Sequence, residues 1–191
     1  MPTALLLPPT HRAITQSAKG ALVISSIPLP PLLPGWVLVK TAAVALNPAD
    51  HKMPARFPAP GSTAGWDFAG TIVRTCPPLA STLQIGDRVC GAVHGSNPSD
   101  PAAGAFAEYV RAEPELLLRV PADMGWEAAA ALGGVGHGTL SLALWDSLGV
   151  PGRVDRPMGT GDEGEEREGR YVLVYGGSTA TGTLAIQLLR L

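Results

Sequence analysis

The chain has 191 residues, with 14 Lys and Arg against 16 Asp and Glu and a formal charge of −2. This near-neutral balance, without a basic run, gives no electrostatic footprint for nucleic acid, and no apolar run reaches the roughly 18–20 residues of a membrane span. Residues 1–9 have a core of only three leucines, no basic start and closing prolines, so we expect no signal peptide. Cys76 and Cys90 lack CxxC spacing and give no disulfide framework. We therefore expect a cytoplasmic protein.

The first 120 residues contain short β-type runs separated by proline and glycine. The predicted strands cover residues 21–24, 35–46, 68–74, 85–93 and 105–110. A proline-rich stretch, residues 28–34, is predicted to be an extended connector. Short strands at this spacing are typical of a sandwich or a small, partly closed barrel.

The composition changes near residue 126. Residues 126–148 are rich in Ala and Leu and predict a helix with a break at 133–138, after which Thr139 or Ser141 marks the restart as a polar residue near the cap. Residues 151–170 are acidic and rich in glycine, which predicts a flexible solvated loop.

The end of the sequence has the pattern strand, glycine-rich turn, helix. Residues 171–175 are a continuous apolar run of the type found in buried parallel strands, and the turn 176–182 leads into a helical pattern. This is the opening unit of a dinucleotide-binding fold, in which small residues let the backbone approach a pyrophosphate at a helix N-terminus. Gly177 and Gly182 match the first and last glycines of the fingerprint, with Thr179 at the middle one. A generic tight turn is the alternative.

Two further stretches are candidates for chemistry. At residues 47–53 a predicted strand ends at Asn-Pro, Asp50 is able to cap a helical turn, and Lys52 then lies near the strand end as a cationic donor for a phosphate or an oxyanion. The alternative is a capped surface turn with a solvated lysine. Asp67 lies between glycines at a strand entry, where a functional role and a carboxylate bonded to the N–H groups of its own turn both stay open.

Six of these stretches occur in an order that resembles the medium-chain dehydrogenase/reductase superfamily, in its zinc-free branch of quinone oxidoreductases and enoyl reductases. The matching stretches are residues 47–50, 65–70, 85–89, 104–109, 127–132 and 171–190. The wording of residues 47–53 and 171–181 resembles most closely the stand-alone, trans-acting enoyl reductases of fungal polyketide clusters. The resemblance implies an α/β fold class with a β-rich part: a GroES-like partial barrel followed by the first β-α unit of a Rossmann fold.

The same resemblance implies three segments. These are a GroES-like catalytic domain at residues 1–150, the acidic flexible loop at residues 151–170 and the start of a truncated Rossmann NADP-binding domain at residues 171–191. Members of the family continue through further β-α units, which carry the residues that read the adenosine ribose. We therefore expect this chain by itself to bind NADPH weakly.

The implied reaction is the reduction of an α,β-unsaturated thioester by NADPH. Hydride reaches the β-carbon, and the enolate oxygen needs hydrogen-bond donors until the α-carbon is protonated. Lys52 is the implied catalytic donor. The implied cofactor-binding residues are Ala49, Asp50, His51, Lys52, Gly177, Ser178, Thr179, Ala180 and Thr181. The implied substrate-binding residues are Thr139, Leu140, Ser141, Leu142, Ala143, Leu144, Trp145 and Asp146.

Zinc-dependent members have a cysteine where Asn47 stands and a His-Glu pair where Trp66 and Asp67 stand, so no metal site is expected. The implied partner is a polyketide synthase that lacks a working enoyl reductase domain and delivers the acyl thioester, and the implied state is a monomer. Two alternatives stay open: a quinone or small-enone oxidoreductase, and a non-catalytic truncated relative that binds a partner.

Overall fold

The computed structural model describes residues 6–150 and 171–190. The acidic loop predicted at residues 151–170 lies outside the described residues. The chain divides into two compact units, Met1–Val135 and Gly136–Leu191. Among the described residues, none of the helices combines the length and the apolar character needed to cross a membrane.

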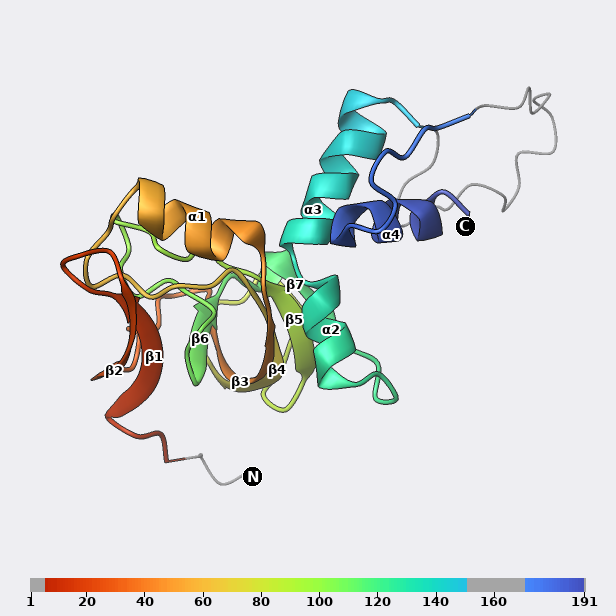
Figure 1. The fold of residues 1–191 in the computed structure, drawn as a ribbon. Coiled ribbons are helices and arrows are strands. Elements are labelled where there is room, and N and C mark those ends of the chain that lie inside the picture. The colour runs from red at the N-terminus through yellow and green to blue at the C-terminus, as the bar shows by residue number, and fades with distance from the viewer. Residues whose placement is uncertain (1–5, 151–170, 191) are drawn as a thin grey trace. The chain divides into compact units, whose positions relative to one another are not determined.

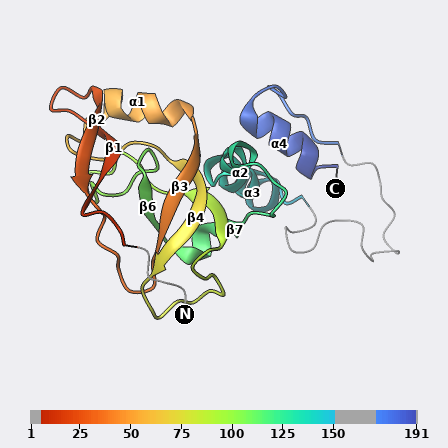
Figure 2. The same ribbon diagram turned by 90° about the horizontal axis from the view of Figure 1, so that it is seen from below.

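The first unit is built around a curved, five-stranded antiparallel sheet (Figure 1, Figure 2) with the strand order β6-β3-β4-β5-β7. The strands are β3 (Val37–Ala45), β4 (Asp67–Thr75), β5 (Arg88–Ala92), β6 (Tyr109–Ala112) and β7 (Leu117–Arg119), with the 3-10 turn η1 (Pro114–Leu116) before β7. The pairing of β3 with β4 shifts register twice. Such irregularities bend and twist a strand, which helps the sheet to curve.

A separate hairpin of β1 (Thr10–Gln16) and β2 (Leu22–Pro28) lies beside this sheet. Isolated bridges join β1 to Ala107 and to Thr63, so the hairpin is attached to two loops of the first unit. The sheet and the hairpin together form the predicted β-rich partial barrel. The sequence analysis did not single out β1, whose residues are mostly polar.

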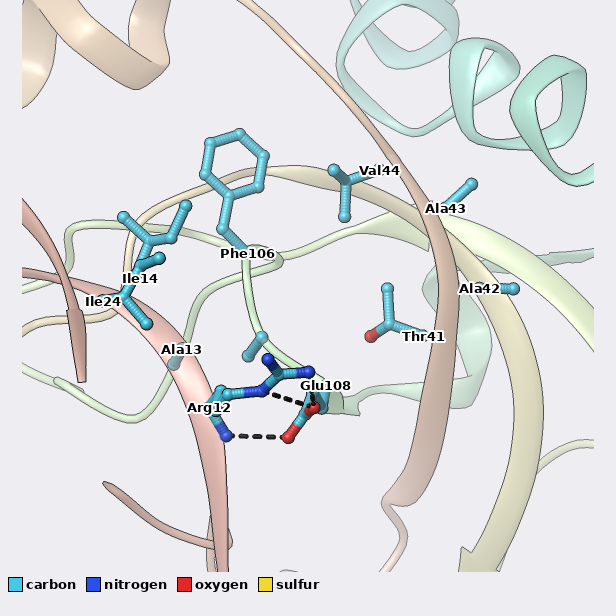
Figure 3. Close-up of a pocket in the computed structure, with 11 residues that line it drawn as sticks. Arg12, Ala13, Ile14, Ile24, Thr41, Ala42, Ala43, Val44, Phe106 and Glu108 are labelled. Atoms are coloured by element: carbon cyan, nitrogen blue, oxygen red, sulfur yellow. Dashed lines mark hydrogen bonds and ion pairs between the residues drawn. The ribbon is translucent and has the colours of Figure 1, made fainter. Parts of the chain in front are cut away.

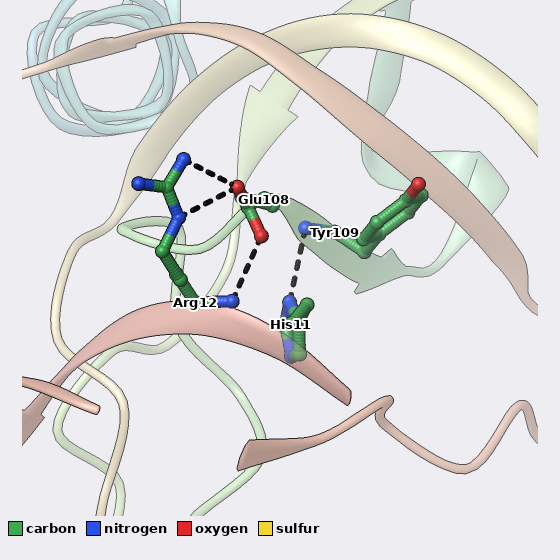
Figure 4. A network of polar contacts seen from close by, with 4 residues as sticks. All are labelled: His11, Arg12, Glu108 and Tyr109. Carbon is green, nitrogen blue, oxygen red and sulfur yellow. Dashed lines mark hydrogen bonds and ion pairs between the residues drawn. The ribbon is translucent and has the colours of Figure 1, made fainter. Parts of the chain in front are cut away.

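Polar contacts also fasten β1 to the segment that enters β6 (Figure 4). The Glu108 carboxylate accepts bonds from Arg12 Nε at 2.9 Å, from Arg12 Nη2 at 2.7 Å and from the Arg12 backbone N–H at 2.8 Å. Beside this pair, His11 Nδ1 accepts a 3.2 Å bond from the Tyr109 N–H, and His11 is buried. The two contacts fix the register of β1 against residues 108–109.

The core of the first unit consists of apolar side chains on one face of the curved sheet. Val39, Phe68, Ile72 and Val89 are completely buried there. Burying a side chain of this size contributes about 1.5–3 kcal/mol relative to leaving it exposed. The apolar residues of the predicted strands therefore anchor the sheet by their burial.

Four of the five predicted strands are present as β2, β3, β4 and β5, and the proline-rich connector after β2 contains no strand. The fifth prediction is partly wrong, because β6 begins at Tyr109 and not at residue 105. The N–H groups of Ala105 and Phe106 donate to the loop carbonyls of Gly65 and Ala64 at 2.9 Å. These residues are therefore bound to a loop and do not continue the sheet.

The helices are α1 (Pro48–Arg56), α2 (Trp126–Leu132), α3 (Val135–Ser141), the π-helix η2 (Leu142–Ser147) and α4 (Ala180–Leu188). The break predicted at residues 133–138 is confined to Gly133 and Gly134, and the prediction that Thr139 or Ser141 restarts the helix is wrong. The restart comes earlier because a side chain distant in sequence, Asp67, accepts the first free N–H groups of α3.

In the second unit, α4 follows the glycine-rich turn as predicted, but residues 171–175 do not form the predicted strand. Tyr171, Leu173 and Tyr175 are 91–99% exposed. A strand needs a neighbour to accept and donate its ladder hydrogen bonds, and the described residues of this unit contain no other strand.

Candidate functional site

Local hydrogen bonds fix the first turn of α1. Asn47 is the N-cap residue with extended backbone angles, and Pro48 occupies the first helical position, where its missing N–H costs nothing. Asp50 Oδ2 accepts a 2.6 Å bond from the Asn47 N–H, and the Asp50 N–H donates to the Asn47 carbonyl at 2.9 Å. Asp50 is therefore a cap residue of its own helix.

The four predicted cofactor-binding residues of the first unit all lie in the first two turns of α1, but they face different surroundings. Asp50 is only 6% exposed, Ala49 is half-buried, and His51 and Lys52 are exposed. The side chains of His51 and Lys52 are therefore the ones that a ligand reaches without any rearrangement.

Asp67 is a buried carboxylate at the start of β4 and is 3% exposed. Its Oδ2 accepts a 2.8 Å bond from Asn47 Nδ2, and its Oδ1 accepts bonds from the N–H groups of Gly134 at 2.9 Å and Val135 at 3.0 Å. One of the two roles left open for Asp67 from sequence was a carboxylate bonded to the N–H groups of its own turn. The structure gives Asp67 partners 20, 67 and 68 residues away instead.

The buried side chains of Asp50, Asp67 and Cys90 form a polar cluster with half-buried Asn47. Burial raises the pKa of Asp50, and repulsion by the Asp67 carboxylate raises it further. Burial also raises the pKa of the Cys90 thiol, again with a contribution from Asp67. Asp50 Oδ1 is buried and has no hydrogen-bond partner among the described residues. Asp50 therefore keeps its proton to a higher pH than an ordinary aspartic acid.

The positions that correspond to zinc ligands in zinc-dependent members hold other contacts. The Asn47 amide donates to Asp67, and the Trp66 ring packs against the His94 ring with 4.9 Å between centroids. In the part of the chain that the structure describes, no group of three or more His, Cys, Asp and Glu side chains is arranged to hold a metal ion. The expected lack of a metal site stays a prediction.

In the second unit, the predicted phosphate-binding residues form the turn before α4. Thr179 is the N-cap: its Oγ1 accepts a 3.0 Å bond from the Gly182 N–H and donates to the Gly176 carbonyl at 2.8 Å. A Cβ added to Gly182 would lie 2.3 Å from the Gly176 oxygen, so the turn is as tight as its glycines allow. Ser178, Thr179 and Ala180 are exposed at this end of the helix.

The predicted substrate-binding residues lie on α3 and η2. Thr139, Leu142 and Asp146 are exposed and follow the i, i+3, i+7 spacing of one helix face, whereas Leu140 and Leu144 are buried. The exposed row is the part of this set that a ligand reaches. The π-helix is closed by an i to i−5 bond from the Leu148 N–H to the Ala143 carbonyl at 3.0 Å. Such segments are rare and frequently occur at functional sites.

The predicted site residues thus form three groups. One group lies on α1 of the first unit, and the other two lie on the α4 turn and on the α3–η2 segment of the second unit. None of their assignments to cofactor or substrate is tested by the structure, and they stay predictions. Asn47, which links Asp67 to α1, was not predicted as a site residue, although an Asn-Pro pair before a helix is a recognisable cap signal.

A shallow groove of about 360 Å³ lies elsewhere in the first unit, between β1 and β3 (Figure 3). Ile14, Val44 and Phe106 give it an apolar lining, and the Arg12–Glu108 pair lies at its edge. It contains none of the predicted site residues.

Comparison with known proteins gives a consistent picture. Residues 33–140 match the family of the alcohol dehydrogenase GroES-like domain. The chain is 52% identical over 97% of its length to the trans-enoyl reductase ffsC of Aspergillus flavipes and 46% identical over its whole length to the trans-enoyl reductase poxP of Penicillium oxalicum. Among solved structures, it resembles an alcohol dehydrogenase superfamily protein from Novosphingobium aromaticivorans, with a TM-score of 0.69 and 28% identity over 94% of the chain.

These matches have one feature in common. The chain spans about half the length of the curated relatives it matches, 50% for each of the two reductases, and 49% of the solved protein. The matched family and the fold of the first unit confirm the predicted GroES-like part of the fold class.

Proposed function

Because the chain belongs to the medium-chain dehydrogenase/reductase superfamily, through its alcohol dehydrogenase GroES-like domain, we propose that it acts as a trans-acting enoyl reductase. Its substrate in this proposal is an α,β-unsaturated polyketide thioester, reduced by hydride from NADPH. The observation that carries the proposal is 52% identity to a trans-enoyl reductase along 97% of the chain. Membership of the superfamily indicates an oxidoreductase, and the thioester substrate is the part that we add as a proposal.

In this proposal, the turn before α4 holds the pyrophosphate of the nicotinamide dinucleotide. The Gly182 N–H donates to the Thr179 hydroxyl and the Thr183 N–H donates to the Thr179 carbonyl, so the N–H groups of Ala180 and Thr181 are the ones left for an anion. The Thr179 hydroxyl is engaged with Gly176 and Gly182, so this residue shapes the turn while the backbone of its neighbours offers the donors. When bound, NADPH supplies the hydride, and we infer NADPH over NADH from the family resemblance.

Lys52 is the residue that we propose to stabilise the developing charge. Its side chain is exposed on α1, one turn beyond the capped start of the helix, and carries three donors on a flexible stem. An ammonium donor beside the thioester oxygen stabilises the enolate that forms once the β-carbon has received hydride. His51, next to it and also exposed, is the second side chain of α1 in reach of a ligand.

The α3–η2 segment supplies the substrate contacts in this proposal. Thr139, Leu142 and Asp146 form one exposed row, in which Leu142 is 64% exposed and offers apolar surface to an acyl chain. Leu140 and Leu144, by contrast, are buried.

We propose as the partner a polyketide synthase without a working enoyl reductase domain, which presents its acyl chain as a thioester in the cytoplasm. In this arrangement the reductase acts as a monomer and meets the synthase only for the reduction step. The support for this part is the trans-enoyl reductase class of the relatives.

The test is a turnover assay with two kinds of acceptor. The purified protein is mixed with NADPH and either an α,β-unsaturated acyl-pantetheine thioester or a free quinone, and NADPH oxidation is followed by absorbance and the product by mass spectrometry. We expect the saturated thioester as the product. When the same acyl chain is carried by an acyl-carrier protein of the synthase, we expect faster turnover than with the acyl-pantetheine thioester.

Two results would contradict this proposal and favour an alternative. Turnover of the free quinone without turnover of the thioester supports a quinone or small-enone oxidoreductase. Stable binding to the synthase with no turnover of either acceptor supports a non-catalytic relative.

A further inference from the structure

Asp67 is the residue on which separate parts of the first unit converge. Its carboxylate lies at the entry of β4 and is 3% exposed. All its hydrogen-bond partners among the described residues are neutral donors: the Asn47 side-chain amide and the backbone N–H groups of Gly134 and Val135. A buried carboxylate is costly unless its oxygens are hydrogen-bonded, so the positions of these three donors are tightly coupled to it.

The backbone around Gly133 is shaped to receive this carboxylate. Gly133 has a φ of +25°, and a Cβ added there would lie 2.5 Å from Asp67 Cγ. A Cβ on Gly134 would lie 2.4 Å from the Ala92 Cβ. The chain therefore passes between Asp67 and β5 only because two successive residues have no side chain.

The contact with Asn47 transmits the position of Asp67 to α1. Asn47 is the N-cap of α1, and its backbone exchanges hydrogen bonds with Asp50 through the 2.6 Å and 2.9 Å contacts. Lys52 follows Asp50 by two residues in the same helix. A shift of the Asn47 side chain therefore moves the turn from which Lys52 projects.

We propose that Asp67 is a positioning residue of the active site, acting through Asn47 on α1 and Lys52 and through Gly134 and Val135 on the start of α3. This inference rests on the proposed function, because it needs Lys52 to be the donor in the reduction. Asp67 itself contacts neither cofactor nor substrate in this role. It sets the geometry of the residues that do, and small errors in such geometry reduce the rate of a reaction strongly.

The test is a reciprocal exchange of the two side chains. Asp67→Asn removes the charge but keeps the shape. Asn47→Asp places a second carboxylate at the 2.8 Å contact. In the double variant the new amide at position 67 donates to the new carboxylate at position 47, while its oxygen still accepts from Gly134 and Val135. Asp87→Asn is the matched control, since Asp87 pairs with Arg119 and takes no part in this cluster.

Steady-state kinetics and amide hydrogen exchange are measured on each variant. For Asp67→Asn we expect kcat to fall by about tenfold with the KM for NADPH within about twofold of the parent value. We also expect amide hydrogen exchange of Gly134 and Val135 to accelerate by about tenfold, because the acceptor loses its charge. The double variant should recover part of both effects, and Asp87→Asn should change neither.

Gly133→Ala provides a second route to the same displacement if Asp67→Asn fails to fold, since its added methyl group meets the carboxylate without removing it. The proposal is overturned if kcat stays within about twofold of the parent in both variants. It is also overturned if the double variant recovers the Gly134 exchange rate without recovering kcat. A parent protein that reduces no enoyl thioester contradicts the proposed function itself, which separates that failure from failure of the positioning role.

Discussion

At the scale of single residues, Asp50 and Lys52 lie two positions apart on α1 and have opposite surroundings. Asp50 is buried and bonded to the N-cap residue, whereas Lys52 is exposed. Residues two apart in a helix point to different sides, so one secures the helix while the other is free for a ligand. The same short segment therefore carries a buried carboxylate that caps the helix and an exposed lysine, the residue proposed as the donor.

The first prediction concerns Lys52. Lys52→Met removes the ammonium but keeps a long side chain, and we expect kcat for the enoyl thioester to fall by about 10²–10³-fold, the usual effect of losing one donor to a developing oxyanion. Lys52→Arg should retain part of the activity because it keeps a cation. Lys40→Met, a change of an exposed lysine on β3, is the control. Equal kcat values for Lys52→Met and Lys40→Met would exclude this role.

The second prediction concerns the pH dependence of stability through His11. Burial lowers the pKa of His11 below its usual value of 6.5, although the Glu108 charge acts in the opposite direction. The unfolded chain then takes up a proton as the pH falls through 6.5, while the folded chain does not. The contribution of His11 to the free energy of unfolding is therefore complete above this pH and is lost as the pH falls towards the lowered pKa.

The measurement for His11 is the urea midpoint of unfolding between about pH 7 and about pH 5. We expect His11→Gln to make the midpoint less dependent on pH in this range. His51→Gln, a change on the exposed side of α1, should leave the dependence as it is in the parent. Parallel curves for the parent and His11→Gln would show that His11 is not responsible.

The partners of single residues show where sequence reasoning stops. The Asn-Pro pair and Asp50 predict the start of α1, since their contacts are local. The role of Asp67 could not be predicted, because its partners are 20 to 68 residues away. Two of the three are backbone N–H groups, and the pattern of side chains in the sequence does not predict where these lie. The sequence showed that Asp67 lies between glycines, but the groups from which it accepts hydrogen bonds come close only in the folded protein.

At the scale of elements, whether a helix or strand is predicted correctly depends on how much of its stabilisation comes from residues nearby in sequence. β3 and β4 were predicted well because both are apolar runs whose side chains are buried in the hydrophobic clusters of the first unit. Residues 171–175 have an equally clear β-pattern, yet form no strand, since that pattern acts only when a neighbouring strand is present. The restart of α3 was predicted too late for the converse reason, because Asp67 caps it from another element.

The prediction at this scale concerns the N-terminus of α4. Thr179→Ala removes the hydroxyl that accepts from the Gly182 N–H and bonds the Gly176 carbonyl, and the loss of such a cap costs about 1 kcal/mol. We expect exchange of the Gly182 amide to accelerate by about fivefold, which corresponds to that energy. Thr179→Ser keeps the hydroxyl and should exchange at the parent rate. Unchanged exchange in Thr179→Ala would show that another group caps the helix.

At the scale of the whole molecule, the predicted site residues are divided between two units. The first unit contains the complete five-stranded sheet, and its α1 carries Lys52. The second unit contains the tight turn and the α3–η2 row, together with apolar side chains at residues 171–175 that have no partner strand among the described residues. The predicted phosphate-binding turn therefore lies in the unit whose described residues contain no strand.

The last prediction follows from this division. We expect the chain of 191 residues to bind NADPH weakly, with a dissociation constant above about 1 μM in a fluorescence titration. The reason is that one glycine-rich turn supplies few of the contacts that a dinucleotide needs. The chain spans half the length of its reductase relatives, and a protein of their full length is the natural comparison. Replacing residues 171–191 of the chain by the corresponding and following residues of such a relative should tighten binding at least about tenfold. Submicromolar binding by the chain alone would contradict this prediction.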